Sequence, residues 1–535
     1  MADNTKTETE VFVRKSSGLK RTFTPLDIMI FTLAYTLGSG VIFFTAQVVG
    51  EYPGASALLA LLIDAIVLIF AVITLWLMGI AIPRSGGQYA WISRVVSPGI
   101  GYLVTLFVWV GYSIIMGDVV YIGSTYIGMA ITIEGHLIHA QNLISIGTTL
   151  GKPVYGVLFG VIIVAVVMLI DMAGYKFARG ATYIAFFIPF VLFIIAIIIM
   201  LLTSHATTVN AFNNVFGAGA YTNVITESNA KGWGASKYLV LSIPATIAAV
   251  VPLMSSWSGV SHAGGWLIGE AKTPKKSMLY GTLIAYAVAA VMMFLAIISY
   301  GVSYGNGFVS RLFLVQSSYG VVVSIPLLAT IIESHYFVPL AIITAIIAPL
   351  FPIKDVLSSL VLQSRQLFSM AFDRLLPEKL TYVHPKLSSP MIAYAATAIA
   401  TMLFVYLSSP MGVGVFVTAG WYVLSVGLLG MFTSLAAFLL PFSRPDIFKT
   451  AESPANKIVA GIPLISIFGA ASFASWLYLL GAAFESTMSA NHGASIMAYI
   501  SVVLGLILVM YAYYAQRLRR MGIPPSMIGK ELPPL

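Results

Sequence analysis

Two glycines flank a serine in the middle of the first long apolar segment, at Gly38, Ser39 and Gly40. Glycine weakens a helix interior by about 1 kcal/mol relative to alanine, so this stretch predicts a break in the helix. We expect a second helical half to begin near Val41. The unpaired N–H groups at its start, together with the positive end of the helix dipole, suit a carboxylate. The alternative is that these glycines only allow close helix packing.

A second interruption lies in the sixth apolar segment, at Ser256, Trp257, Ser258 and Gly259. Carbonyl groups freed there would accept hydrogen bonds from an ammonium group, and the Trp257 indole would wall the pocket by apolar or cation–π contact. The alternative is a glycine kink beside a packing tryptophan. Broken helices in lipid require the freed backbone to line a cavity or to be buried in protein. Paired breaks are typical of secondary transporters, so we predict a polar substrate site at membrane depth.

Ionisable residues inside the apolar segments are costly and therefore candidates for function. Lys354 and Asp355 form the deepest pair, while Asp64 and Asp118 lie in two other segments without an assigned role. Neighbours on a helix point about 100° apart, so each member of the pair is predicted to have another partner. Coupling to an ion is one role for Lys354 and Asp355, and a structural ion network is the alternative. His262 is a further candidate for a proton-responsive group. The alternative is a structural role, as a polar residue whose hydrogen bonds are satisfied within the helix bundle.

Aromatic residues in two other segments are candidate side walls of the substrate site. They are Trp109 and Tyr112 in the third segment and Trp421 and Tyr422 in the tenth. Aromatic residues are common in membrane helices, so the alternative for each is a position in the core or against lipid.

The composition indicates a helical membrane protein with little room for a soluble domain. Apolar residues make up 59% of the 535 residues and charged residues only 9%, against about 25% charged residues in soluble proteins. The chain has no cysteine, and His136 and His139 lack acidic company in an expected outer loop, so no metal site is predicted. Motifs for nucleotide binding or zinc-dependent proteolysis do not occur. We therefore expect no cofactor, no enzymatic activity with catalytic residues and no nucleic-acid partner.

Runs of about 20 apolar residues predict an all-α protein with about twelve transmembrane helices. The predicted spans are 27–48, 55–82, 99–128, 153–172, 179–202, 239–268, 278–303, 327–361, 389–408, 412–441, 458–483 and 494–516.

The distribution of positive charge predicts the orientation of these spans. Of the 28 lysines and arginines, only Lys152, Lys231, Lys237 and Arg311 fall in loops on one side, and Lys354 falls within a span. All others lie on the side of the N-terminus. The positive-inside rule then predicts a multi-pass protein of the cell membrane with both termini cytoplasmic.

Two segments between spans have mixed polarity. Residues 85–97 predict an interfacial helix leading into the third span, and 363–380 predict an amphipathic helix on the inner surface. Spans 1–5 and 6–10 form a candidate pair of repeats, which an odd number of helices would place in opposite orientations. The expected organisation is a tail at 1–26, a first repeat at 27–202, an outer loop at 203–238, a second repeat at 239–441, helices 11 and 12 at 442–516, and a tail at 517–535.

Four motifs follow one another along residues 24–410. They are the glycine-rich break at 38–43, the segment 83–94, Ser258-Gly259 followed by 269–276, and Ser364-Arg365 through Asp373 followed by Leu376-Pro377 and His384-Pro385. In this order they resemble the amino acid–polyamine–organocation superfamily of transporters. The resemblance implies the inverted five-plus-five helix fold of the bacterial leucine transporter, with two additional C-terminal helices, and transport by alternating access.

The chain departs from that family in three helices. Relatives often carry a glutamate two positions after the glycine in helix six, where this chain has Ser261. Sodium-coupled relatives place two hydroxyl residues in helix eight, where this chain has Phe351 and Pro352. Some proton-coupled relatives place a lysine in helix five, where this chain has Ile188. Lys354 is then the candidate to replace the missing cation, with its charge sensitive to burial.

The leading interpretation is a secondary transporter of amino acids, embedded in the lipid bilayer and driven by proton coupling or exchange. A polyamine or amine transporter of the same superfamily is the first alternative, although helix six lacks the acidic cluster expected for polycations. An amino acid sensor that does not translocate its ligand is the second, and the short predicted tails disfavour it.

Overall fold

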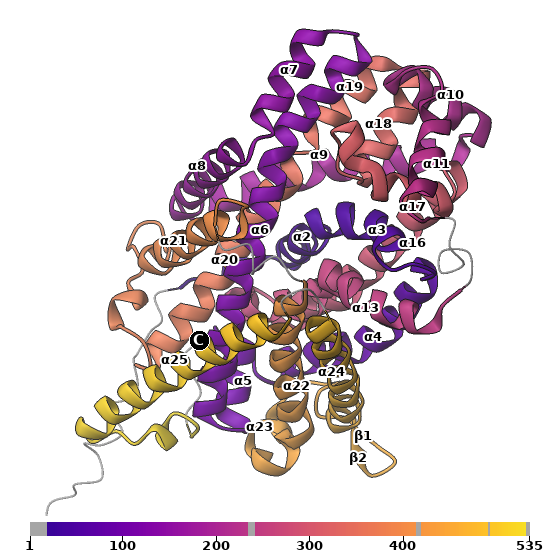
Figure 1. The fold of residues 1–535 in the computed structure, drawn as a ribbon. Helices are drawn as coiled ribbons and strands as arrows, with labels where there is room; N and C mark the ends of the chain where they lie inside the picture. Colours follow the sequence, from indigo (N-terminus) through magenta and orange to yellow (C-terminus); the bar gives the residue numbers. More distant parts are fainter. Residues whose placement is uncertain (1–18, 234–240, 413–418, 490–492, 531–535) are drawn as a thin grey trace, which may run out of the picture.

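The computed structural model describes residues 19–233, 241–412, 419–489 and 493–530. Within these residues the chain is almost entirely helical, with one two-stranded hairpin (Figure 1). Twelve helical segments in the described part are long and apolar enough to cross a membrane. The predicted all-α polytopic fold is therefore confirmed, while the inverted repeat stays a prediction.

Most of the spans are single helices. They are α4 (Ala57–Ala81), α6 (Pro98–Leu137), α8 (Pro153–Met172), α9 (Tyr175–Leu202), α21 (Met391–Ser408), α22 (Ala419–Ser443), α24 (Leu464–Ser489) and α25 (Gly493–Arg520). The other spans consist of consecutive helical pieces. These are α2 (Pro25–Thr36) with α3 (Ser39–Glu51); α13 (Ile243–Trp257) with η1 (Ser258–Ser261), α14 (Ala263–Leu267) and η2 (Ile268–Glu270); α15 (Pro274–Leu279) with η3 (Tyr280–Ile284) and α16 (Ala285–Ser303); and α19 (Val338–Ile347) with α20 (Leu350–Phe372).

Shorter elements gather at two ends of the molecule (Figure 1). The α10 end carries α7 (Gln141–Leu150), α10 (His205–Phe216), α11 (Ala220–Ala230), α17 (Asn306–Val315) with η4 (Gln316–Tyr319), and α18 (Ile325–Tyr336). The α23 end carries α5 (Gln88–Val95), α23 (Pro445–Thr450) and the hairpin of β1 (Ile458–Val459) and β2 (Ile462–Pro463). The remaining short helices are η5 (Glu378–Thr381) and η6 (Pro525–Met527).

The first span lies at the centre of the bundle and the fourth at its edge. In the most apolar window of each span, 83% of the first is buried but only 22% of the fourth. The fourth span, α8, buries one stripe that includes Gly156, Gly160 and Val164, spaced by one helical turn. Its other face is apolar and exposed, as expected of a helix against lipid. The central position of α2 and α3 makes their break a buried feature.

The predicted eighth span, 327–361, is wrong at its start. Residues of α18 form a separate buried helix at the α10 end, and the span begins at Val338. The chain is extended at Phe337, with φ −157° and ψ 94°, and Pro339 follows in the first turn of α19. Proline has no N–H to continue a preceding helix, so the apolar run divides there.

The amphipathic surface helix predicted at 363–380 is also wrong. Helix α20 continues without a break to Phe372, and Gln363 to Ala371 are buried. Their polar side chains are paired inside the protein: Ser113 donates to Gln363 at 3.1 Å, and Arg365 pairs with Glu270. Buried polar pairs and a solvated face produce the same alternating pattern in a sequence.

Other connecting segments contain more structure than predicted. The helix expected within 85–97 is present as α5, but all of its residues are buried rather than interfacial. The expected loop 203–238 contains α10 and α11, and its last residues, from 234, lie outside the described part. Helix α6 extends to Leu137, so His136 is helical. The β1–β2 hairpin occupies the start of the predicted eleventh span, which begins at Leu464.

Candidate functional site

The predicted break in the first span is confirmed, and the helix that follows it begins at Ser39, two residues earlier than the expected Val41. Helix α2 is capped by Leu37, and α3 starts at Ser39 after Gly38, which is extended with φ −97° and ψ −157°. A Cβ atom at Gly38 would overlap the carboxylate of Asp355, so close approach requires glycine here. The break leaves backbone carbonyls at the end of α2 and N–H groups at the start of α3 in need of partners.

Lys354 and Asp355 of α20 provide hydrogen-bond partners for the backbone groups on both sides of this break. The Lys354 ammonium donates to the carbonyls of Ala34 at 2.9 Å and Leu37 at 2.6 Å. The Asp355 carboxylate accepts from the N–H of Ser39 at 2.7 Å. The cation thus lies at the negative end of α2 and the anion at the positive end of α3, as the helix dipoles favour.

The two side chains also pair with each other, with 3.0 Å between Lys354 Nζ and Asp355 Oδ1. The expectation that each has another partner is therefore confirmed, and those partners are backbone groups. The two charges compensate one another although both residues are buried, at 1% and 2% exposure. Without such compensation, two isolated charges would be very costly in this interior.

A small cavity of about 30 Å³ lies directly beside the break. One wall is apolar, formed by Phe44 of α3 and by Ile115, Met116 and Val119 of α6. Predicted site residues from both broken spans contribute to the cavity, which is lined by Tyr35, Gly38, Gly40, Phe44, Ile115, Met116, Val119, Ser255, Ser256, Gly259, Asp355 and Tyr422.

The second predicted break is confirmed where α13 ends at Trp257 and a tight 3₁₀ turn follows. Its glycine packs against the first span, because a Cβ at Gly259 would meet the ring of Tyr35 at 2.7 Å. The two interruptions therefore contact each other at the centre of the protein.

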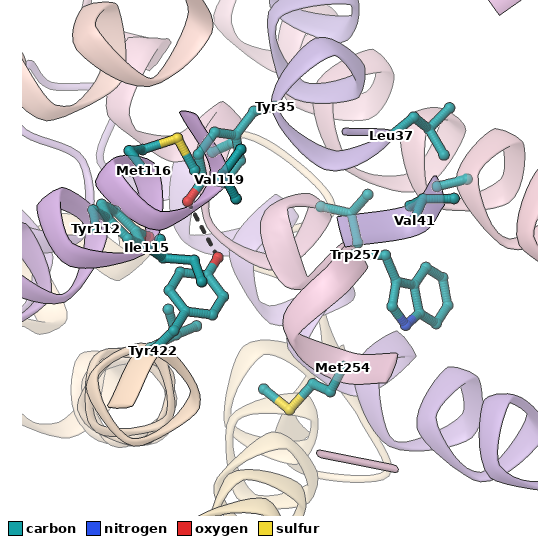
Figure 2. Close-up of a cluster of buried hydrophobic side chains, with 14 of the residues drawn as sticks. Tyr35, Leu37, Val41, Tyr112, Ile115, Met116, Val119, Met254, Trp257 and Tyr422 are labelled. Atoms are coloured by element: carbon teal, nitrogen blue, oxygen red, sulfur yellow. Dashed lines mark hydrogen bonds between the residues drawn. The ribbon is translucent and has the colours of Figure 1, made fainter. Parts of the chain in front are cut away.

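Tyrosine hydroxyls close one side of the cavity. The Tyr35 and Tyr422 hydroxyls lie 3.2 Å apart (Figure 2). Ser258 donates to the Tyr422 hydroxyl at 3.3 Å. The ring of Tyr112 packs on both tyrosines, with centroid distances of 5.9 and 5.8 Å. Tyr422 thus lines the cavity as predicted for a side wall, whereas Tyr112 packs on the lining tyrosines and its contact with substrate stays a prediction. Tyr35, one turn before the break, was not singled out from the sequence.

The family of the chain follows from comparison with known proteins. The model of the family described as amino acid permease matches residues 23–509, which include both broken spans and α20. The chain belongs to the amino acid permease family. A search of curated proteins finds no match. The permease is therefore a multi-pass membrane protein that transports amino acids or related organic cations.

The three tryptophans predicted near the substrate of this permease contact neighbouring helices. The Trp257 indole donates to the Asp64 carboxylate of α4 and stacks on Tyr286 at 5.4 Å. Figure 2 shows this indole apart from the three tyrosines. The indole N–H of Trp109 donates to Thr397 at 3.3 Å, and Trp421 packs on Phe107 at 5.9 Å. A direct contact between any of these indoles and substrate stays a prediction.

His262 lies beside the tyrosines of the permease. Its ring stacks on Tyr112 at 5.3 Å and meets the Tyr35 ring edge-on at 5.7 Å. The side chain is 1% exposed, and neither ring nitrogen has a hydrogen-bond partner among the described residues. The expectation of a satisfied polar residue is therefore not met, which leaves His262 as a candidate for proton exchange.

Three ion pairs join distant elements of the permease on the α2 side of the break, and two of them are buried on both sides, whereas the Arg179 side chain of the third is 45% exposed. Arg365 binds Glu270 through two hydrogen bonds of 2.8 and 3.0 Å, and Arg94 binds Asp373 in the same two-pronged manner. Asp27, which also caps α2, accepts from Arg179 at 2.6 Å and from the hydroxyls of Tyr175 and Tyr183. These pairs connect α20 to η2 and α5, and α2 to α9.

A larger hollow of about 460 Å³ lies at the surface and is separate from this site. It is lined by Trp76, Thr273, Pro274, Lys275, Lys276, Leu279 and Glu452. Of the residues predicted to bind substrate, Gly38, Gly40, Ser256 and Gly259 line the small central cavity, and none lines this hollow.

Proposed function

We propose that this permease is a secondary transporter of amino acids that works by alternating access across the cell membrane. The observation that carries the proposal is the broken first span, where the carbonyls of α2 and the N–H groups of α3 meet beside a buried cavity. The carbonyls freed at the second break, at 256–259, suit an ammonium group, the N–H groups at the start of α3 suit a carboxylate, and every amino acid has both. We propose that the repeats 27–202 and 239–441 move against each other, with both termini cytoplasmic.

The apolar wall of Phe44, Ile115, Met116 and Val119 favours an uncharged, apolar side chain. The test is a thermal-shift screen of the purified protein over the twenty amino acids and putrescine, followed by uptake into proteoliposomes. We expect stabilisation by amino acids such as leucine or methionine, and uptake of the same compounds. Uptake of putrescine alone would support the amine transporter, and binding without uptake would support the sensor.

Gly40 tests the location of the site. A Cβ at Gly40 would lie 2.9 Å from Ser256 Cα, so a leucine side chain must fill the cavity or separate the two breaks. We expect Gly40→Leu to abolish uptake while the protein is still inserted. Gly505→Leu in α25 is the matched control, because nothing lies within 4 Å of a Cβ there. Normal uptake by Gly40→Leu would reject this carboxylate site.

We propose that transport is independent of sodium and uses proton coupling or exchange. The Lys354 ammonium lies on the carbonyls of Ala34 and Leu37, where a bound cation would otherwise be needed. Uptake should be equal in sodium and choline and respond to an inward proton gradient unless the mode is exchange. Lys354→Met should remove the pH dependence, and Lys354→Arg should keep the charge fixed, because guanidinium does not deprotonate. A strict sodium requirement would reject the proposal.

His262 is the second coupling candidate, and the same assay separates the two. If His262→Gln removes the pH dependence while Lys354→Met retains it, the transported proton binds at the histidine. The reverse result assigns the coupling to Lys354.

A further inference from the structure

The N-terminus of α3 already has a carboxylate ligand in this structure. Asp355 accepts from the Ser39 N–H at 2.7 Å, is 2% exposed and lines the cavity. A cavity of about 30 Å³ has room for no more than a few water molecules while Asp355 lies on its wall. The same backbone N–H that suits a substrate carboxylate is thus occupied by the protein itself.

On the other side of the break, Lys354 occupies backbone carbonyls of α2 in the same way. The Lys354 ammonium binds two carbonyls of α2, within 3.0 Å of Asp355. An ammonium on the carbonyls and a carboxylate on the amide form the charge pattern of an amino acid zwitterion. The pair is also electrically neutral as a whole, which disfavours a polycation as the ligand that displaces it.

We infer, building on the function proposed above, that Asp355 is an internal competitor of the substrate carboxylate and caps the break when the site is empty. A substrate with a carboxylate takes the Ser39 N–H from Asp355, which stays compensated by Lys354. An amine without a carboxylate has no group that replaces Asp355 as the acceptor of this hydrogen bond. Asp355 therefore determines specificity, because a ligand must displace it from the Ser39 N–H and the free energy of that displacement depends on whether the ligand replaces the hydrogen bond.

The internal cap also has a role in the transport cycle. An empty carrier can close and reorient only if its buried backbone groups have partners. With Asp355 and Lys354 in place these groups are satisfied without substrate, so the empty permease can return. Net uptake then depends on the cap, whereas exchange of one substrate molecule for another does not.

The binding test compares wild type with Asp355→Asn, whose neutral amide caps more weakly than a carboxylate. The probes are the amino acid found in the screen above and its decarboxylated amine; for a leucine carrier these are L-leucine and isopentylamine. If Asp355 caps α3 in nine-tenths of the empty protein molecules, removing this cap tightens amino acid binding about tenfold and leaves amine binding unchanged. Asp118→Asn is the control for removal of a buried carboxylate and should change neither affinity.

Weaker or unchanged amino acid binding by Asp355→Asn would overturn the inference. A parallel loss of affinity for the amine would show that Asp355 binds the substrate ammonium. Failure of every amino acid to bind wild type would instead reject the proposed function. If Asp355→Asn does not fold, Lys354→Met with Asp355→Asn removes both charges together and leaves no unpaired one, and the same tightening relative to wild type is expected.

The transport test uses one preparation of proteoliposomes for two assays. We expect Asp355→Asn to retain exchange of internal for external amino acid, which also verifies its fold, and to lose most net uptake. Equal rates of net uptake in the variant and in wild type, with exchange intact, would overturn the role of the cap in the return step.

Discussion

Buried ion pairs join distant elements on the α2 side of the permease, whereas aromatic and hydrogen-bond contacts join elements at the α10 end. On the first side the buried pairs Arg365–Glu270 and Arg94–Asp373 link α20 to η2 and α5, and a third pair with an exposed arginine, Asp27–Arg179, links α2 to α9. At the α10 end, Arg311 lies over the Trp233 ring at 3.5 Å, and Tyr221 stacks on Phe308 at 3.8 Å.

These two kinds of contact respond differently to separation. Breaking a buried ion pair leaves an uncompensated charge and costs about 3–5 kcal/mol. An aromatic pair or an exposed cation–π contact contributes about 0.5–1.5 kcal/mol. We therefore expect the α10 end to open first, while the α2 side stays closed until a larger change in the site occurs.

Arg365→Met is the strongest test of this comparison. It leaves the Glu270 carboxylate buried without its two-pronged partner, so we expect a loss of about 3–5 kcal/mol in unfolding free energy. The measurement is thermal or denaturant unfolding of the purified protein. Arg365→Met combined with Glu270→Gln should recover most of the loss, because no lone charge remains. If Arg365→Met alone is as stable as wild type, the ion pairs on the α2 side do not hold their elements more strongly than the contacts at the α10 end hold theirs.

The pH dependence of stability tests how Glu333 is buried at the α10 end. This residue of α18 is fully buried, and the nearby Thr344 hydroxyl of α19 offsets only part of the effect of burial on its carboxylate. Burial raises the pKa of Glu333 to about 7, above its ordinary value of 4.5. The folded protein then binds a proton that the unfolded chain has released, so stability falls as the pH rises from about 4.5 through 7.

The expected loss is up to about 3 kcal/mol between pH 5 and pH 8. Glu333→Gln should flatten this slope, since its side chain does not titrate, and unfolding measured against pH gives the difference between the two proteins. His335 on the same helix is present in both, so its own titration cancels. Equal slopes would show that Glu333 is charged in the folded protein.

Single-cysteine labelling sharpens the comparison, because the chain has no cysteine of its own. Ser255 lines the cavity and is only partly buried, so Ser255→Cys reports access to the site. We expect a membrane-impermeant thiol reagent to label it about tenfold faster from the α10 end, which corresponds to a preference of about 1.4 kcal/mol. Adding Arg365→Met should raise labelling from the other side. Faster labelling of Ser255→Cys from the α23 end would reverse the expected order of opening.

Arg311→Ala gives the smallest expected effect. It removes the contact with Trp233 and hydrogen bonds to Ser228 and Asn229 of α11. We expect a loss of about 1 kcal/mol in unfolding free energy, because the site is partly exposed and water replaces the lost partners. A loss as large as that of Arg365→Met would mean that both ends are equally secured.

The sequence predicted the breaks because their signals are local. Gly38 and Gly40 stand out in an apolar run, and Ser258-Gly259 repeats the pattern in another. The position of Lys354 in a span could be predicted for the same reason, but its partners could not. They are carbonyls of α2, more than 300 residues away in the chain, and only the packing of α20 against α2 brings them together.

Side-chain directions were less predictable than helix positions. Trp257 lies beside the second break as expected, yet its N–H needs an acceptor when buried and finds one in Asp64. The pattern at 363–372 predicted a surface helix because polar residues paired inside a bundle resemble polar residues in water. Arg365 is such a case, since its acceptor, Glu270, belongs to another span.

The size of the central cavity has a consequence for the energy balance of the cell. A cavity with room for only a few water molecules cannot hold a file of waters that crosses the whole bundle and conducts protons. Each proton that leaks across a potential of 100 mV dissipates about 2.3 kcal/mol. We therefore expect proteoliposomes that contain the permease without substrate to hold a proton gradient as long as protein-free ones, so that a cell can keep many copies in its membrane without draining the gradient that other carriers use.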